Sequence, residues 1–349
     1  MSDRQVVVKE LGPADIGRWD GFVERCPNAT FFHRAGWKRV LEESFGHRTY
    51  FLYAERGGQL VGVLPLAQVK SRLFGNALTA MAFCVQGGPA TEDAAAKAAL
   101  DRRALELADR LDVDHLEYRS ETATQTGQDG WLVKSDLYVA FRRALEADPE
   151  KNLTAIPRKQ RAEVRKGLEM GLDCAVEDAA DNIWAIYAES VRNLGTPVFA
   201  RRYFRALKAE FGDACECLVL RKDGRIVSGV LSFYFRDQVL PYYGGGSHAA
   251  RGLRANELMY YDIMRRASTR GVKLFDFGRS KLGTGAYAFK KNWGFKPVPL
   301  NYEYKLRRGD RLPDVNPLNP KYRLMIETWK RLPLPVANTI GPWVARSLG

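Results

Sequence analysis

Hydrophobic and polar positions alternate in a hairpin pattern at two places in the chain, and both patterns end in Gly-Val-Leu. Residues 50–66 read YFLYAERGGQLVGVLPL, and residues 217–233 read CLVLRKDGRIVSGVLSF. Each stretch predicts two strands joined by a glycine-containing turn. The shared glycines, Gly62 and Gly229, lie 229 − 62 = 167 residues apart. Each copy continues with a glycine pair, a helical stretch and a short strand, LEYRS in one and LFDFGRS in the other. A repeat of this length predicts a duplicated domain rather than a solenoid.

The remaining periodicity adds helices on both sides of these strands. Apolar spacing predicts helices over 16–25, 29–46, 91–112, 152–172, 183–192, 201–211 and 256–270, the last with Asn256 as N-cap. It predicts strands over 6–11, 113–119, 216–222, 226–236, 238–243 and 272–277, with a final hairpin that includes 293–306. The fold class is therefore α/β (α+β), with mixed sheets and helices on both faces. No strand leads into GxGxxG, so a Rossmann unit is excluded.

The domain organisation follows from the repeat. We expect domains at 1–150 and 151–307, followed by a tail at 308–349 that begins with a proline-rich linker. The pattern over residues 323–349 predicts a helix in which Trp329 lies beside Lys330 and Arg331. Two interpretations stay open for this helix. It docks on the body of the protein, or it anchors the chain at a membrane interface, where Trp, Lys and Arg are favoured.

Composition limits the cellular location and the kinds of partner that we expect. The five Cys contain no CxxC, and the four His lack metal-ligand spacing, so we expect reduced thiols and no metal. The chain starts without a signal-peptide apolar region and holds no membrane-length apolar run, which predicts a cytoplasmic protein. A net charge of +13 favours an anionic partner: a phosphorylated substrate, a nucleic acid or an acidic lipid surface.

The stretch 274–304 is richest in chemistry. Asp276 and Arg279 end a strand, where sites cluster in open α/β sheets. Glycines at 278, 283 and 285 permit unusual backbone conformations near a ligand, and Lys281, Lys290 and Lys291 supply donors for an oxyanion or phosphate. One of the two adjacent lysines should point inward if Phe289 and Trp293 pack. The alternative is a solvated basic loop over a structural Asp–Arg pair.

Two further stretches are candidate anion sites. Arg158, Arg161 and Arg165 share one helix face that has no acidic partner, and a plain solvated face is the alternative. The segment 239–261 joins a strand with Tyr243 and Gly245 to a loop with Arg251 and Arg254 and to the helix start at Asn256. Helix starts bind anions, and this loop loosely resembles the pyrophosphate loop of GNAT acyltransferases; a tight structural turn is the alternative. No Ser–His–Asp or Cys–His arrangement is evident, which disfavours covalent hydrolase chemistry.

Several motifs together resemble the FemAB family, in particular its branch associated with exosortase (PEP-CTERM) and exopolysaccharide gene clusters. The resemblance covers residues 5–349 and is carried by FDFGRS, GAYAFKKNWGF, TFFHRAGWKRVLEESFG, IPRKQRAEVRKGLEMGL, SVRNLGTPVF and NPKYRLMIETWKRLPLP. It implies two tandem GNAT-like domains with a cleft between them. It also implies direct transfer of an acyl group from acyl-CoA or aminoacyl-tRNA, with no tightly bound cofactor and no covalent enzyme intermediate.

The resemblance also implies roles for individual residues. Lys290 corresponds to the family's Phe-Lys near the transfer centre, where it would stabilise the oxyanion and bind phosphate. Arg192 corresponds to an arginine that faces precursor phosphates, and Asp276 and Arg279 to the strand that ends in the cleft. Asp276, or a water it holds, would take the proton from the acceptor. This chain departs from the cell-wall members in having no heptad-rich arm for tRNA and in carrying a proline-rich tail after residue 312.

These observations predict an N- or O-acyltransferase that modifies a saccharide- or lipid-linked precursor of exopolysaccharide or cell-envelope biosynthesis. The donor is acyl-CoA or aminoacyl-tRNA, and residues 323–349 make peripheral contact with the inner membrane. Three alternatives stay open. They are a non-catalytic binding or scaffold protein for an anionic glycan intermediate, a tRNA-dependent aminoacyltransferase of peptidoglycan bridges, and a nucleic-acid binder suggested by charge alone.

Overall fold

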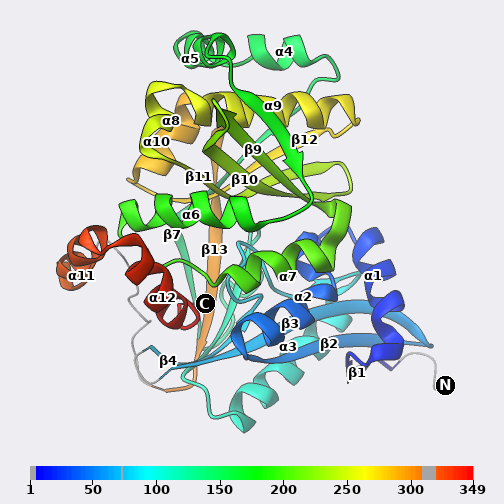
Figure 1. Ribbon diagram of the computed structural model, residues 1–349. Coiled ribbons are helices and arrows are strands. Elements are labelled where there is room, and N and C mark those ends of the chain that lie inside the picture. Colours follow the sequence, from blue (N-terminus) through cyan, green and yellow to red (C-terminus); the bar gives the residue numbers. More distant parts are fainter. Residues whose placement is uncertain (1–4, 72–73, 309–319, 349) are drawn as a thin grey trace. The chain divides into compact units, whose positions relative to one another are not determined.

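The computed structural model describes residues 5–71, 74–308 and 320–348, and it divides into two compact units (Figure 1). Unit 1 contains the chain up to Leu137, Pro299–Pro313 and Arg346–Gly349. Unit 2 contains Tyr138–Val298 and Asp314–Ala345. The chain therefore passes between the units four times, and neither unit is one continuous segment.

Unit 1 is a mixed sheet with helices on both faces. Its strands are β1 (Val7–Glu10), β2 (Arg48–Arg56), β3 (Gln59–Ser71), β4 (Gly75–Ala80), β5 (Ala90–Thr91) and β6 (His115–Ser120), and its helices are α1 (Ile16–Arg25), α2 (Gly36–Phe45) and α3 (Ala94–Arg110). Strands β1 to β4 pair antiparallel, and β4 pairs parallel with β6. Phe51 stacks on Trp19 of α1, whereas the next residue, Leu52, shares a core cluster with Leu100 of α3. This alternation along β2 places α1 and α3 on opposite faces.

Unit 2 repeats this plan. Its strands are β8 (Asp173–Glu177), β9 (Cys215–Lys222), β10 (Arg225–Phe235), β11 (Gln238–Gly246) and β12 (Leu274–Lys281). Its helices are α4 (Pro149–Thr154), α5 (Arg158–Glu169), α6 (Asp181–Leu194), α7 (Arg201–Phe211), α8 (His248–Gly252), α9 (Ala255–Thr269), α10 (Gly285–Asn292), α11 (Pro320–Arg331) and α12 (Leu334–Ala345). Strands β8 to β11 pair antiparallel, and β11 pairs parallel with β12. Figure 1 shows α9 on one face of this sheet and α6 on the other, with α5 outside α9.

The last strand of each sheet comes from the other half of the sequence. In unit 2, β12 pairs antiparallel with the Tyr138–Ala144 part of β7 (Trp131–Ala144), which precedes all the other strands of that unit. In unit 1, β6 pairs antiparallel with the Asn301–Leu306 part of β13 (Lys296–Leu306), which follows every strand of unit 2. Each copy of the duplicated domain is thus completed by a strand from beyond its own sequence repeat.

Most predicted elements are confirmed, and the duplicated mixed-sheet fold is confirmed with them. Several local predictions were wrong or incomplete. The expected final hairpin at 293–306 is the single strand β13, which pairs with β6, and the helix expected over 29–46 is limited to α2. The helix over 152–172 is two helices, α4 and α5, because the position before Pro157 disfavours helix. The loop after Gly246 contains the short helix α8, and α10 was missed altogether. Asn256 is not an N-cap: Arg254 occupies that position with a φ of 53° and no side-chain cap.

The C-terminal tail packs on unit 2, as the first of its two interpretations predicts. Helices α11 and α12 both contact α6. Trp329 of α11 is buried, and a Cβ atom at Gly195, which ends α6, would lie 2.5 Å from the Ile326 side chain. In α12 a Cβ atom at Gly341 would lie 3.0 Å from the backbone nitrogen of Val198. Small residues therefore allow α12 to lie close to the segment after α6.

Candidate active site

A β-bulge in β12 is the centre of the candidate site. Asp276 pairs with Arg142 of β7 and Arg279 pairs with Ala140, so Phe277 and Gly278 together oppose the single residue Phe141. Gly278 adopts a φ of 69°, which L-residues other than glycine rarely adopt. A bulge of this kind turns backbone groups out of the ladder. The carbonyl groups at Gly278 and Arg279 become acceptors for a side chain from outside the sheet.

Lys290 of α10 occupies this position. Its Nζ donates to the carbonyl oxygens of Gly278 at 3.1 Å and Arg279 at 2.9 Å. The ammonium group also lies 5.6 Å from the ring centroid of Phe277 and 5.9 Å from that of Phe141. Burial lowers the pKa of Lys290 to about 7, helped by the charge of Arg279 and opposed by the charge of Asp276. The site therefore holds an amine that changes its charge near neutral pH.

The segment around Lys290 packs as its sequence predicts. Thr284 caps α10 by accepting a hydrogen bond from the backbone N–H of Tyr287. Trp293 is fully buried, and Phe289 packs against the same core cluster. Lys290 consequently points inward, whereas Lys291 is exposed to solvent. The prediction that one of the two adjacent lysines faces the interior is confirmed.

Asp276 holds the bulge in place. Its Oδ2 accepts from Nε of Arg142 at 2.6 Å, and its Oδ1 accepts from the backbone N–H of Gly278 at 2.8 Å. The side chain is buried, so both contacts act with little screening by water. The structural Asp–Arg pair suggested by the sequence exists, but the partner is Arg142 and not Arg279. The Arg279 guanidinium carbon instead lies 4.6 Å from the ring centroid of Tyr138.

The positive φ of Gly278 gives a testable expectation. A Cβ atom there would come no closer than 3.9 Å to Pro241, so Gly278→Ala should act through backbone strain and not through a clash. We expect the free energy of unfolding in urea to fall by about 1–2 kcal/mol. Gly285→Ala is the matched control, because Gly285 starts α10 without a positive φ and has open space around it. Equal effects of the two substitutions would contradict the strained bulge.

The strand pair beside the bulge opens after a short ladder. In the described register β11 and β12 pair through Gln238–Leu274 and Val239–Phe275, although β11 runs on to Gly246. A second irregularity falls in β11. Leu231 and Ser232 of β10 pair with Tyr243 and Pro241 of β11, so Tyr242 is an extra residue in β11. Parallel strands that separate in this way leave backbone N–H and C=O groups on their facing edges. An extended ligand with amide groups can pair with such edges.

A hollow of about 770 Å³ lies beyond the end of β11, on the surface of unit 2. Its lining consists of Asn193, Leu194, Ser247, His248, Ala249, Arg251, Gly252 and Arg254. Arg254 is fixed by an ion pair with Glu163 at 2.6 Å and donates to the carbonyl of Arg251 at 2.9 Å. The side chain of Arg251 is exposed. The hollow thus brings two arginines to the amino end of α9, a position that favours negative charge.

Three residues predicted to bind substrate have packing roles in this structure. The Tyr243 hydroxyl hydrogen-bonds that of Tyr203 at 2.9 Å inside an aromatic cluster. Gly245 permits close approach of α6, since a Cβ atom there would lie 2.8 Å from the carbonyl oxygen of Ile186. Asn256 accepts a hydrogen bond from Ser228 at 2.7 Å. These contacts explain the residue types without a ligand.

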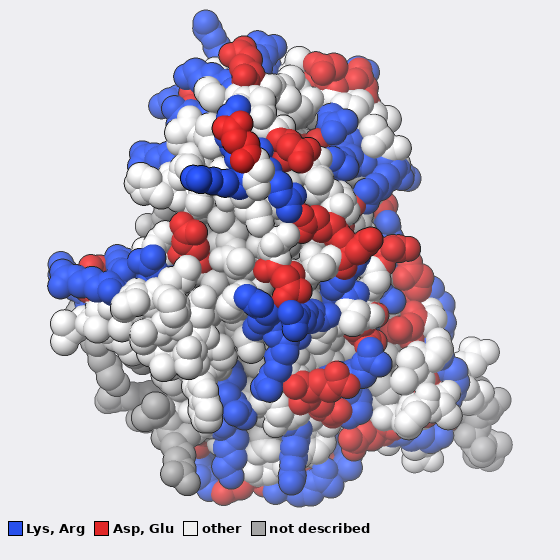
Figure 2. Space-filling view, in the orientation of Figure 1, with Lys and Arg blue, Asp and Glu red and all other residues white. Residues whose placement is uncertain are grey.

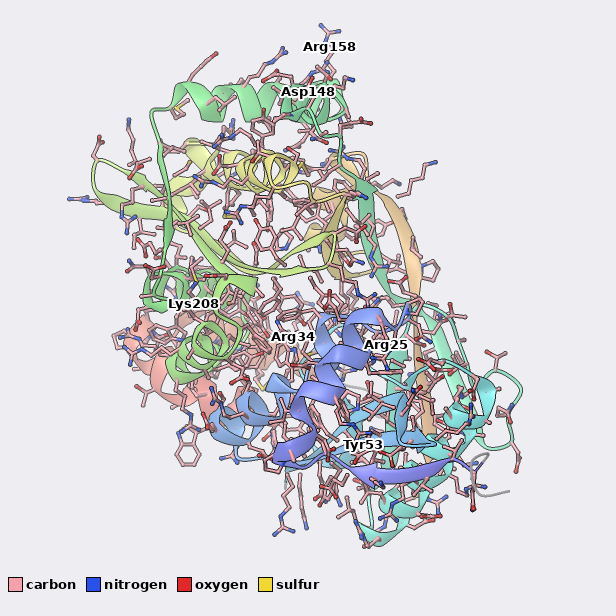
Figure 3. The ribbon with its side chains drawn as sticks, turned by 90° about the vertical axis from the view of Figure 1, so that its right-hand side faces the viewer. Arg25, Arg34, Tyr53, Asp148, Arg158 and Lys208 are labelled. Atoms are coloured by element: carbon pink, nitrogen blue, oxygen red, sulfur yellow. The ribbon has the colours of Figure 1, made fainter. Side chains whose placement is uncertain are left out.

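The predicted arginines occupy separate places in unit 2. Arg158 and Arg165 of α5 are exposed, and Figure 3 shows Arg158 pointing away from the ribbon. Arg161 donates to the carbonyl of Thr154 at 2.6 Å. Arg192 donates to the carbonyl of Lys330 at 3.2 Å, at the end of α11. Arg192 therefore supports the tail, and the structure does not bring it together with Lys290 through any contact among the described residues.

The equivalent position in unit 1 is closed. Strand β6 carries Glu117 and Arg119 where β12 carries Asp276 and Arg279, but β6 pairs with β13 without a bulge. Arg119 donates to Glu117 at 2.6 Å and to the carbonyl of Cys84 at 2.9 Å, and both side chains are buried. Its backbone also forms a bridge with Gly87. In unit 1 the segment with Cys84 and Gly87 therefore covers the side of β6 that corresponds to the open side of β12.

The described fold is a duplicated α/β fold of the GNAT type, and comparison with known proteins agrees. Residues 154–291 match the family described as an acetyltransferase (GNAT) domain. This match bears out the prediction of an acyltransferase and falls on the unit that contains Lys290. No curated protein sequence matches the chain.

Several solved structures resemble most of the chain. The crystal structure of FemX is similar with a TM-score of 0.70 and 16% identity, covering 92% of this chain and 100% of its own. The C-terminal domain (DUF2156) of a putative lysylphosphatidylglycerol synthetase from Agrobacterium fabrum gives 0.56 and 14%, covering 84% of this chain and 92% of its own. A tandem GNAT protein from the clavulanic acid biosynthesis pathway gives 0.54 and 15%, covering 88% and 100%. At these identities the likeness concerns the fold.

Proposed function

We propose that this protein is a cytoplasmic N- or O-acyltransferase whose chemistry takes place in unit 2. The observation that carries the proposal is Lys290, which is enclosed between the β12 bulge and two aromatic rings beside the opening of β11 and β12. The GNAT match over residues 154–291 supports the class of reaction. The FemAB-like motifs support direct transfer with no tightly bound cofactor.

The geometry suggests how the acyl donor binds. The extended arm of a thioester donor pairs with the free edges of β11 and β12, and its phosphates enter the hollow that Arg251 and Arg254 line. An aminoacyl-tRNA end offers the same combination of a carbonyl group and phosphates. The departures from the tRNA-dependent members, together with the closed packing of unit 1, favour acyl-CoA as the co-substrate.

The chemical step then needs three events. The acceptor amine or hydroxyl attacks the carbonyl carbon, forming a C–N or C–O bond, while protonated Lys290 stabilises the developing oxyanion. The C–S bond then breaks and the thiolate leaves. A water held at Asp276 takes the acceptor proton and passes it to the thiolate. Each oxygen of Asp276 already accepts one hydrogen bond and keeps a further lone pair with which it can hold this water.

The acceptor we propose is a saccharide- or lipid-linked precursor of exopolysaccharide or cell-envelope biosynthesis. The resemblance to the exosortase-associated branch and the net charge of +13 support an anionic precursor of this kind. A precursor held by lipid lies at the inner membrane. We therefore propose that residues 323–349 bring the enzyme into peripheral contact with that surface.

The donor site is tested by calorimetric titration of acetyl-CoA. We expect Arg251→Ala to weaken binding by about 10- to 100-fold, because each charge-assisted hydrogen bond to phosphate contributes roughly 1.5–3 kcal/mol. Arg158→Ala, an exposed arginine on α5, is the control and should leave the affinity unchanged. If acetyl-CoA does not bind but aminoacyl-tRNA does, with a steep loss of affinity as salt rises, the thioester assignment is wrong.

A further inference from the structure

Large apolar side chains in the tail point away from the body of unit 2. Helix α12 turns its small residues, Ala337, Gly341 and Ala345, into the interior, where they are buried. Its larger residues Val336, Ile340 and Trp343 lie at i, i+4 and i+7 on the opposite face and are exposed. A helix that only docks on a protein core shows the reverse arrangement.

Helix α11 also carries exposed apolar side chains. Ile326 and Trp329 face α6, whereas Leu324 and Met325 are exposed. We define the tail face as the exposed apolar residues of both helices: Leu324, Met325, Val336, Ile340 and Trp343. Leu324 is 79% exposed and Trp343 is 75% exposed, more than any other large apolar side chain in the described residues. Exposure of this extent marks an interaction surface.

The charges around the tail face indicate what covers it. No charged residue occurs between Leu332 and Ala345, and the preceding helix carries Arg323, Lys330 and Arg331. Figure 2 shows Lys and Arg side chains over α11 beside uncharged surface over α12. The acidic residue Glu327 already pairs with Lys330 at 2.7 Å. The surface is therefore apolar with a cationic border.

We infer that the tail face inserts into the surface of an anionic lipid bilayer. Tryptophan suits the boundary between headgroups and acyl chains, and Lys and Arg beside it attract anionic headgroups. Within the described residues no helix has the length and apolar content needed to cross a bilayer. The mode is thus interfacial, with α12 lying along the surface over about 18 Å.

A second copy of the chain fits the tail face less well. A symmetric dimer formed through this surface would place the cationic borders of both copies, each with Arg323, Lys330 and Arg331, in one interface. Like charges placed together in this way oppose association. An anionic bilayer instead complements the border and accepts the apolar side chains.

The inference deepens the proposed function, since a lipid-linked acceptor lies in the membrane, but its test requires no turnover. The full-length protein is sedimented with vesicles of phosphatidylcholine alone and with an equimolar mixture of phosphatidylglycerol and phosphatidylcholine. We expect binding to the mixed vesicles, and weaker binding as salt rises. A triple variant, Val336→Ser with Ile340→Ser and Trp343→Ser, should lower partitioning by about tenfold or more. Leu168→Ser, an exposed leucine of α5, is the matched control and should bind as the wild type does.

Trp343 supplies a second readout. Its fluorescence should be quenched by brominated lipids, and Trp343→Phe should keep binding but lose most of that quenching. Failure of the wild-type protein to bind mixed vesicles would overturn the inference, as would undiminished binding by the triple variant. A concentration-dependent dimer that the triple variant abolishes would assign the tail face to a second copy. Vesicle binding without acyl transfer would leave the inference standing and remove the proposed function.

Discussion

Replacing Lys290 with alanine should lower kcat by about 10²- to 10³-fold, the range found when a single oxyanion donor is removed. Two backbone carbonyls and two aromatic rings hold the Lys290 ammonium in place, so in the proposed role it would need no search through rotamers. Thiol release from an acyl-CoA donor in single-turnover experiments measures the effect. Lys291→Ala is the control, because Lys291 is the exposed neighbour on the same helix. An equal loss in both variants would contradict the proposed role.

The pH dependence separates an oxyanion donor from a merely structural lysine. With a pKa of about 7, Lys290 is protonated below neutrality and loses its proton as pH rises. If the protonated form acts, kcat/KM of the wild type falls as pH increases through about 7. Lys290→Arg should move this fall to a much higher pH, because the guanidinium stays charged. A profile that the Arg variant leaves unchanged would assign the titration to another group.

The free energy of unfolding should rise with pH over the range in which the activity falls. Burial depresses the folded-state pKa of Lys290 from 10.5 to about 7, so between these values the unfolded chain binds more protons at this residue. The contribution of Lys290 to the free energy of unfolding is therefore unfavourable below about pH 7 and is relieved as pH rises toward 10.5. Relative to the wild type, Lys290→Met should be more stable at pH 6 than at pH 10, because Met carries no charge to bury, and urea unfolding of both proteins at the two pH values measures this difference. An inactive but stabilised variant would show that lost activity does not come from lost folding.

The sequence predicts the candidate site as far as local patterns allow. The spacing of Phe289 and Trp293 is sufficient to predict that one adjacent lysine faces inward, since a side chain between two packed aromatics shares their face. The bulge at Gly278 was beyond prediction, because it depends on the register between β12 and a strand more than 130 residues earlier in the chain. The inserted glycine itself was a usable signal: LFDFGRS has one residue more than LEYRS between its acidic residue and its arginine.

Tyr243, Gly245 and Asn256 show why glycine- and aromatic-rich motifs predict ligand contacts poorly. Each has a residue type that suits both a binding loop and a tightly packed junction, and only the tertiary contacts distinguish the two. For Gly245 the deciding contact is α6, whose backbone approaches within 2.8 Å of a Cβ position. The hollow beside Arg251 could not be predicted from a local motif. Its lining combines the end of α6 with α8, which lies more than 50 residues later in the chain. The assigned roles of these residues stay predictions.

The exchange of strands between the two halves leads to the second large effect. A fragment that starts at residue 151 lacks the part of β7 that pairs with β12. It loses the buried side chains Val139 and Phe141, and it leaves Asp276 buried without Arg142. Removing one such apolar side chain costs about 1–5 kcal/mol, and an unpaired buried carboxylate costs more. Together these losses are comparable to the whole stability of a domain, about 5–15 kcal/mol.

We therefore expect residues 151–349 to be insoluble or to lack a cooperative urea transition. Residues 131–349 are the matched comparison. This longer fragment differs from the shorter one only by residues 131–150, which contain β7, the loop after it and the first two residues of α4. Both fragments lack β6, so the loss of the partner of β13 cancels between them. Far-ultraviolet circular dichroism and urea titration of the two fragments provide the measurement. Equal midpoints would mean that β7 is dispensable and that unit 2 folds from its own sequence repeat alone. A cooperative transition seen only with β7 would show that the duplication became a single folding system, in which the strand supporting Lys290 belongs to the other half of the sequence.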